Sequence, residues 1–497
     1  MNDASGREPT PVSGASQVVR NVAAMSLAEG VTRVLAFAYN VALMRYLGAL
    51  GYGQYAFAFA LVALVGSAGE WGFGMLTARE VAREPRRAGF LIGNLTVVDV
   101  ALGGAVLATT VAIAAASGRP PAVLAATALV ALFWTTASVT ELLNGVVRGR
   151  ERLDLEGALS LVEKCLAVGL GFYGIWRRWE LPALVGITLA AGLGRTALTF
   201  AVVRARFAEG GTELKPQQWP ALIREAIPLG LAGILMLSYY RVDMVLLPLL
   251  CGERALGVYA AARKLVDALS FVPSAFLNAT LPRLSRHAVA DPESFRRGAL
   301  QACKAIALAT FPVAGFLSAF AEPLATKLLG QDFAVSADVL RVVAWSYALM
   351  GTNYVLWSTL TAADRQVHAL RCTAAALAAN VLLNLCLIPR LHHLGAAVSL
   401  VATEGIACAL MCRAARDLVP VHTLPALWLR PGLSVAVLVL TALIIMPHSL
   451  IAAALASASA FAGAAFITRA VTPDDWRTAV SGLFRRVSDE ATTVTHP

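Results

Sequence analysis

The chain has 497 residues, of which 58% are hydrophobic and only 14% charged, and its net charge is +10. A soluble domain usually carries about 25% charged residues, so this composition excludes an ordinary soluble protein. It indicates helices whose outer faces meet lipid. Apolar runs such as residues 35–44 and 435–446 lack the alternation of a barrel strand. We therefore expect an all-α integral membrane protein.

Fourteen apolar spans, separated by charged turns or turns with Pro and Gly, are predicted along the chain. They cover residues 18–47, 51–82, 88–116, 121–147, 154–176, 181–204, 220–250, 254–282, 297–321, 335–362, 368–388, 394–415, 426–446 and 449–468. Several exceed the roughly 20 residues that a bilayer needs, so these helices are expected to tilt or to project beyond it.

Both ends of the chain are polar. Residues 1–15, rich in Gly, Ser and Pro, predict a disordered cytoplasmic tail rather than a signal peptide. Residues 471–497 predict a second cytoplasmic tail, which either lies along the inner surface of the membrane or is disordered. Seven scattered cysteines and the pair His392-His393 lack metal-ligand or redox spacing. We expect no metal site and no cofactor.

Basic residues are distributed unevenly over alternate loops. With the N-terminus in the cytoplasm, the inner loops and tails hold about 26 Lys and Arg, and the outer loops about 6. This bias predicts a multi-pass membrane protein with an even number of spans and both termini inside. It also explains the net charge without nucleic acid, which we do not expect as a partner.

A weak internal repeat is visible in two predicted outer turns. Gly53, Tyr55 and Ala56 of the first turn coincide with Gly257, Tyr259 and Ala260 of the turn after the seventh span, at an offset of 204 (257 − 53). The repeat predicts two six-helix lobes related by a pseudo-twofold axis, residues 16–210 and 211–420, followed by two more helices at 421–470. Two-lobed transporters bind substrate between their lobes.

Several motifs resemble those of a known family. The first half contains Arg45-Tyr46-Leu47-Gly48, Gly51-Tyr52-Gly53-Gln54-Tyr55-Ala56, Gly72-Phe73-Gly74 and Arg79-Glu80-Val81-Ala82-Arg83. The second half contains Tyr240-Arg241-Val242-Asp243, Gly257-Val258-Tyr259, Leu281-Pro282 and Leu329-Gly330-Gln331-Asp332-Phe333. Together they resemble bacterial polysaccharide flippases of the multidrug/oligosaccharidyl-lipid/polysaccharide exporter superfamily, over about residues 16–415.

The resemblance implies a function. It implies a flippase of the bacterial cytoplasmic (inner) membrane that moves an undecaprenyl-pyrophosphate-linked oligosaccharide from the inner to the outer leaflet for surface polysaccharide biosynthesis. Its partners would be the polyprenyl-pyrophosphate-linked saccharide and the lipid bilayer, with H⁺ or Na⁺ as candidate coupling ions and a polymerase of the same pathway as a candidate partner.

Cations inside the spans indicate where such a head group would bind. Arg241 and Arg263 each lie eleven residues from Gly252, roughly 16 Å below the outer surface. The planar fork of arginine binds phosphate oxygens bidentately. We expect Arg33, Arg241, Arg263 and Lys264 to line a basic cavity between the lobes and to bind the pyrophosphate.

Acidic residues in the spans are candidates for ion coupling, because such residues are costly in lipid and usually functional or paired. They are Glu29, Glu70, Asp243 and Glu404. Glu29 and Asp243 are the leading candidates because they lie beside the cavity cations. In the alternative interpretation, Arg33 pairs with Glu29 and Arg241 with Asp243, and the charges only join helices. For most of the four, a hydrogen bond to a neighbouring helix is the simpler role.

Two other functions remain open. A cation-coupled drug antiporter of the same superfamily predicts an acidic binding chamber and typically twelve helices. A membrane-embedded glycosyltransferase or polymerase predicts a large outer loop with catalytic residues, whereas the outer loops here are short. No nucleophile motif and no glycine-rich phosphate loop occurs. We therefore expect no catalytic residues and no enzyme.

Overall fold

The computed structural model describes residues 12–67, 72–207 and 213–471, with the side chains before Gly30 excluded. All regular structure in these ranges is helical, which confirms the expected all-α fold. The predicted tails, 1–15 and 471–497, fall mostly outside the described residues.

The first helices are α1 (Val12–Ser67), α2 (Phe73–Arg83), α3 (Ala88–Ala116), α4 (Pro121–Gly149), α5 (Leu153–Trp176), α6 (Leu181–Arg206), α7 (Trp219–Cys251) and α8 (Glu253–Asp267). The later ones are α9 (Phe271–Ala290), α10 (Pro292–Ala319), α11 (Ala321–Pro323), α12 (Ser336–Ala362), α13 (Gln366–Leu391), α14 (His393–Ala415), α15 (Leu424–Ile445) and α16 (Leu450–Ile467).

Short 3-10 or π turns join several of these helices. They are η1 (Pro85–Arg87), η2 (Pro216–Gln218), η3 (Leu324–Leu329), η4 (Gln331–Phe333) and η5 (Val421–Thr423).

Eleven helices of the described chain are long and apolar enough to cross a membrane, or up to twelve if α8 and α9 together form one bent span. The fourteen predicted spans correspond to these twelve, counting α8 and α9 as one, together with two more: a second span within α1, and α12. α1 carries the first predicted span and most of the second, and it is broken at Gly48, whose φ of 63° and ψ of −178° suit only glycine. α12 carries the tenth predicted span but is not among the eleven helices counted above.

Two of the predicted spans are interrupted. The span predicted at 51–82 is not one helix, because α1 ends at Ser67 and α2 starts after Gly72, whose φ of 79° is left-handed. The span predicted at 254–282 is divided between α8 and α9, which are bent by 41°. Pro273 explains this second break, because a proline has no N–H to continue the helix from α8.

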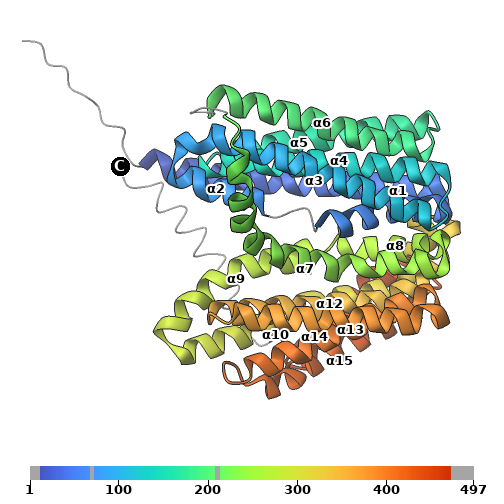
Figure 1. Cartoon of the computed structure of the whole chain (residues 1–497). Coiled ribbons are helices and arrows are strands. Elements are labelled where there is room, and N and C mark those ends of the chain that lie inside the picture. The colour runs from blue at the N-terminus through green and yellow to red at the C-terminus, as the bar shows by residue number, and fades with distance from the viewer. Residues whose placement is uncertain (1–11, 68–71, 208–212, 472–497) are drawn as a thin grey trace, which may run out of the picture. The chain divides into compact units, whose positions relative to one another are not determined.

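The chain divides into two compact units, Met1–Gly257 and Val258–Pro497. Within the first unit, α3 packs on α4, α4 on α6, and α5 on both α1 and α6 (Figure 1). One of its apolar clusters joins Leu91 and Leu95 of α3 to Leu142 and Val146 of α4, all fully buried. These helices are apolar on several faces because they meet both neighbouring helices and lipid.

Asn94 joins α3 to the segment that leads into α7. Its side-chain oxygen accepts hydrogen bonds from the Lys215 backbone N–H (2.7 Å) and the Trp219 indole (2.9 Å). Its amide donates to the carbonyl oxygens of Phe90 and Glu213, both at 2.9 Å. Asn94 is completely buried, and four hydrogen bonds offset the cost of burying its amide. α7 therefore belongs to the first unit.

The two repeat turns, residues 48–53 and 252–257, pack directly against each other. A Cβ on Gly53 would lie 1.8 Å from the carbonyl oxygen of Glu253, and one on Gly257 would lie 1.7 Å from that of Ala49. Adding the offset of 204 to residues 49 and 53 gives 253 and 257. The contact is therefore reciprocal, as a local twofold relation requires, and glycine is needed on both sides.

An ion pair supports these turns from the end of α3. Arg119 Nη1 donates to Glu253 (3.2 Å), and its Nη2 donates to the Pro248 carbonyl (2.9 Å). The guanidinium also lies over the ring of Phe57, 4.7 Å from its centre, an arrangement that attracts a cation. Gln54 completes the group with a hydrogen bond to Glu253 at 3.0 Å.

The second unit is built on α10, α12, α13 and α14, with α15 packed on α10 and α16 on α15 (Figure 1). One of its apolar clusters joins Ile306 of α10, Leu356 of α12 and Met411 of α14. α15 and α16 expose large apolar side chains on their remaining faces, among them Ile444 and Ile451, which are 70% and 75% exposed. Such surfaces suit contact with lipid.

Candidate functional site

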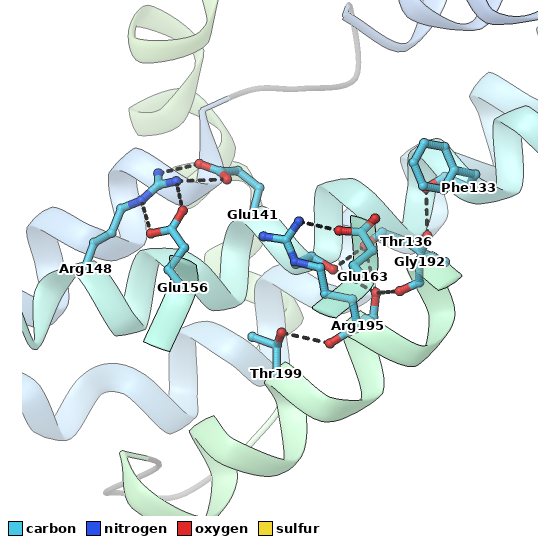
Figure 2. A network of polar contacts seen from close by, with 11 residues as sticks. Phe133, Thr136, Glu141, Arg148, Glu156, Glu163, Gly192, Arg195 and Thr199 are labelled. Carbon is cyan, nitrogen blue, oxygen red and sulfur yellow. Dashed lines mark hydrogen bonds and ion pairs between the residues drawn. The ribbon is translucent and has the colours of Figure 1, made fainter. Parts of the chain in front are cut away.

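Charged side chains inside the spans fall into distinct groups, and the first is centred on Arg148. Its guanidinium donates to Glu141, seven residues earlier on α4, at 2.5 and 3.2 Å. It also donates to Glu156 on α5, at 2.9 and 2.6 Å. Figure 2 shows the arginine held between the two carboxylates. Bidentate pairs of this kind fix geometry as well as charge, so this group joins α4 to α5.

A second pair joins α5 to α6. Arg195 Nη1 donates to Glu163 Oε2 at 2.7 Å, and the two side chains are 18% and 14% exposed. On the same helix as Arg195, Thr196 donates to the carbonyl oxygens of Thr136 (3.1 Å) and Gly192 (2.9 Å). Each charge in this pair has a partner of opposite sign, which is how buried charges are usually tolerated.

The motif Arg79-Glu80-Val81-Ala82-Arg83 forms a third group at the end of α2. Glu80 is 9% exposed. It accepts a hydrogen bond from Arg87, and its Oε1 lies 3.4 Å from Arg79 Nε and 3.6 Å from Arg83 Nη1. Arg79 also donates to Glu225 of α7. The motif residues therefore contribute to packing of the first unit.

The predicted pyrophosphate-binding residues of the first unit are Arg33 and Arg241. Arg33 is exposed on α1. Arg241 lies half-buried near the middle of the apolar part of α7, where its Nη1 is 3.4 Å from the sulfur of Met244. A guanidinium at this depth is costly unless a partner or a polar cavity receives it.

Of the predicted acidic residues, the structure describes the side chain of Asp243 but not those of Glu29 and Glu70. Asp243 is 1% exposed, and its carboxylate accepts the N–H of Met244 at 2.8 Å. Glu29 and Glu70 lie outside the residues whose side chains are described, so the expected pair of Glu29 with Arg33 stays a prediction.

The predicted binding residues of the second unit, Arg263 and Lys264, are neighbours on α8. Arg263 is only 4% exposed and donates to the hydroxyl of Tyr259 at 3.1 Å. Its Nε lies 3.7 Å from Asp267 Oδ1 on the same helix. Lys264 is half-buried. Arg263 is thus held in place from within its own helix.

Buried amides gather around Glu404 in the second unit. Asn353 of α12 donates to Glu404 Oε2 at 2.7 Å. On α13, Asn384 donates to the side-chain oxygen of Asn380 at 2.8 Å. The amide nitrogen of Asn380 in turn donates to the hydroxyl of Thr403 on α14 at 3.1 Å. These hydrogen bonds join α12, α13 and α14.

Asp99 of α3 is the residue that sequence reasoning missed. It is 3% exposed, and Ser138 of α4 donates to its Oδ1 at 2.7 Å. Its other oxygen, Oδ2, has no donor within the described part of the chain. An aspartate in the apolar run 88–116, with no basic residue nearby in sequence, was a signal that could have identified it.

The family of the chain follows from comparison with family models. A model described as "Polysaccharide biosynthesis protein" matches residues 18–288, more than half of the chain. The chain belongs to the polysaccharide biosynthesis protein family. A second model, MatE, matches residues 228–386. These matches confirm the expected place in the multidrug/oligosaccharidyl-lipid/polysaccharide exporter superfamily. No curated protein sequence matches the chain.

Solved structures share the fold. A lipid II flippase, MurJ, in an inward closed conformation has a TM-score of 0.68 at 12% identity, covering 89% of this chain and 98% of its own. An inward-facing multidrug resistance transporter of the MATE family has a TM-score of 0.63 at 15% identity, over 78% of this chain and 95% of its own. A transporter of the same superfamily from Pyrococcus furiosus has a TM-score of 0.56 at 14% identity, over 82% and 96%. At these identities the likeness establishes the fold alone.

Proposed function

We propose that this chain is a flippase that moves an undecaprenyl-pyrophosphate-linked oligosaccharide across the cytoplasmic membrane for surface polysaccharide biosynthesis. The observation that carries the proposal is the match of residues 18–288 to the polysaccharide biosynthesis family. The fold shared with a lipid II flippase supports it. In this proposal the chain is not an enzyme, and both termini lie in the cytoplasm.

The head group is the part of the substrate that most needs the protein. A pyrophosphate loses its bound water when it enters the membrane, and several cations must take the place of that water. Arg33, Arg241, Arg263 and Lys264 are our candidates for this role. Arg241 is favoured by its depth in α7, and Arg263 by its rigid hold on α8, because a guanidinium that is already ordered loses less entropy on binding.

The saccharide and the prenyl chain require fewer specific contacts with the protein than the head group does. The saccharide would pass through an aqueous cavity that opens first to one side and then to the other, by alternating access. The prenyl chain would stay in lipid, and the exposed apolar side chains of α15 and α16 offer it a surface. H⁺ or Na⁺ would drive the cycle, with Glu29 and Asp243 as the first candidates for binding the ion. Glycosyltransfer would supply the substrate, and a polymerase would consume it.

Translocation between leaflets in proteoliposomes tests the proposal. A fluorescent pyrophosphate-linked saccharide is loaded in one leaflet, and its arrival in the other is followed by quenching. We expect Arg241→Gln to slow arrival by about tenfold, equal to the loss of one charge-assisted contact, and the fourfold variant at Arg33, Arg241, Arg263 and Lys264 to abolish it. Arg152→Gln, which removes an exposed ion pair with Asp154 at the start of α5, is the matched control.

The possible results distinguish a wrong binding-site assignment from a wrong function. If the fourfold variant moves the probe at the rate of the natural chain, the binding assignment is wrong. If the natural chain moves no pyrophosphate-linked saccharide of any kind, the flippase proposal is wrong.

A second candidate function is cation-coupled export of small molecules. The MatE match over residues 228–386 favours it. This function predicts that the reconstituted chain releases cationic dyes against their gradient, and that neutralising Asp243 stops the release. Dye export without any saccharide movement would select it over the flippase.

A further inference from the structure

Asp99 is a carboxyl group buried near the middle of a membrane-spanning helix. It lies eleven residues into α3, about 16 Å from the start of this helix. It is 3% exposed. The hydroxyl of Ser138 is its hydrogen-bond donor at 2.7 Å, and Oδ2 has no donor among the described residues. A carboxylate with one neutral donor is poorly compensated for the loss of water.

A small cavity, mostly apolar but with a few polar side chains, borders the carboxyl group. It is lined by Gly66, Asp99, Leu102, Gly103, Val106, Trp134, Thr135 and Ser138. Its volume of about 10 Å³ is close to the smallest space that holds one water molecule. The indole N–H of Trp134 has no acceptor in the part of the chain that the structure describes. The hydroxyl of Thr135 donates to the Ala131 carbonyl (3.0 Å), so its oxygen still has a free lone pair.

Other charges do not line this cavity. The helices α1, α2, α4 and α7 and the turn η1 pack against α3. Their charged side chains with described positions are Arg33, Arg45, Arg79, Glu80, Arg83, Arg86, Arg87, Glu141, Arg148, Arg224, Glu225, Arg241 and Asp243. Asp99 is the one titratable residue among the eight that form the described lining.

We infer that Asp99 binds and releases a proton during the transport cycle, an inference that rests on the proposed transport function. On binding, an O–H bond of a hydronium ion breaks, its proton forms an O–H bond at Oδ2, and a neutral water molecule remains. On release this bond breaks, the electron pair stays on the oxygen, and the proton returns to water. The neutral acid is the form that burial in lipid favours. The ionised form keeps the Ser138 hydroxyl as a donor and requires water in the cavity, which the Trp134 N–H and the Thr135 oxygen are placed to bind.

The chemistry of the site favours a proton over a metal cation. A hard cation needs several oxygen ligands around it. Only three of the lining residues, Asp99, Thr135 and Ser138, carry side-chain oxygens. No group of three or more metal-binding side chains occurs in the described chain. A proton needs only one oxygen and no extra volume.

The first test measures proton binding without transport. The fluorescence of the purified full chain in detergent is titrated with pH, because Trp134 lines the same cavity as the carboxyl group. We expect an emission change that is present in the natural chain, lost in Trp134→Phe and lost in Asp99→Asn. Asp154→Asn, which changes an exposed aspartate of the same unit, should keep it. If Asp99→Asn titrates like the natural chain, or if Na⁺ rather than pH produces the change, the inference is wrong.

The second test measures use of the proton. Proteoliposomes containing the pyrophosphate-linked probe are given a pH gradient. The natural chain should move the probe faster with the gradient than without it, whereas Asp99→Asn should move it at one rate in both conditions. If Asp99→Asn still responds to the gradient, Asp99 does not couple transport. If the natural chain moves no probe, the proposed function fails, while the fluorescence titration still decides whether Asp99 binds a proton.

Discussion

Two regions of the first unit bury carboxyl groups in different ways. On α5, Glu163 lies against Arg195 at 2.7 Å, so a permanent positive charge compensates its negative charge. On α3, the hydroxyl of Ser138 donates to Asp99 Oδ1 at 2.7 Å, and Oδ2 has no donor among the described residues. The two hydrogen bonds have equal length, but only the first comes from a cation. A carboxylate beside an arginine keeps its charge and serves structure, whereas one beside a hydroxyl is free to lose its charge and can serve transport.

Breaking the pair on α5 and α6 should have the largest effect on stability. Arg195→Met leaves Glu163 as a buried charge without its partner, and such losses cost about 3 kcal/mol. We expect a clearly lower temperature of thermal unfolding in detergent. The double variant Arg195→Met/Glu163→Met should recover most of the loss, because no unpaired charge remains. Equal stability of the single variant and the natural chain would mean that the ion pair contributes nothing.

Removing the charge from Asp99 should have a much smaller effect, and in the opposite direction. Asp99→Asn keeps an oxygen that accepts from Ser138 and removes a buried acid, so stability should stay equal or rise by about 1 kcal/mol at most. The same unfolding experiment checks this. A loss as large as that of Arg195→Met would show that Asp99 depends on a cation and would remove the difference between the two regions.

The smallest effect is expected at an exposed pair outside the spans. Arg365, which precedes α13, donates to Asp417, which follows α14, at 2.9 and 2.6 Å. The guanidinium holds the pKa of the Asp417 carboxyl below its usual value of 3.8. Its contribution to stability is therefore present above this value and is lost as the pH falls through the lowered pKa.

Variants at this pair test the pH dependence. Because Asp417 is 56% exposed, Asp417→Asn should cost less than about 1 kcal/mol at neutral pH. The difference in unfolding temperature between this variant and the natural chain should disappear in acid. A difference that grows as the pH falls would contradict the assigned pairing.

Much of the fold could be predicted from sequence because lipid imposes a strong composition. The apolar spans from 88–116 to 181–204 correspond closely to α3–α6. The interruptions were harder to predict. Gly72 precedes α2 and Pro273 lies in the first turn of α9, so both breaks fall inside predicted spans, and hydropathy alone gives no boundary there. The repeat offset of 204 was visible, but the direct packing of Gly53 on Glu253 and of Gly257 on Ala49 required coordinates.

The charged residues were less predictable, because pairing depends on which helix faces which. Spacing suggested Arg241 with Asp243, but it gave no sign that Arg195 reaches Glu163, 32 residues away on another helix. Likewise, Glu404 stood out as an acid in an apolar span, yet only the fold reveals that Asn353 of α12 donates to it. Asp99 is likewise an acid in an apolar span, but the hydrogen bond that it accepts from Ser138 of α4 could be found only from the fold.

The contrast between these two carboxyl groups is tested most directly by infrared difference spectroscopy of the full chain as the pH is lowered. Protonation of a buried carboxyl group produces its own C=O band, separate from that of the carboxylate. We predict a band that appears in the natural chain and in Glu163→Gln and is absent from Asp99→Asn. A band that survives in Asp99→Asn and disappears in Glu163→Gln would contradict this account, because the ion-paired carboxyl group would then be the one that exchanges its proton.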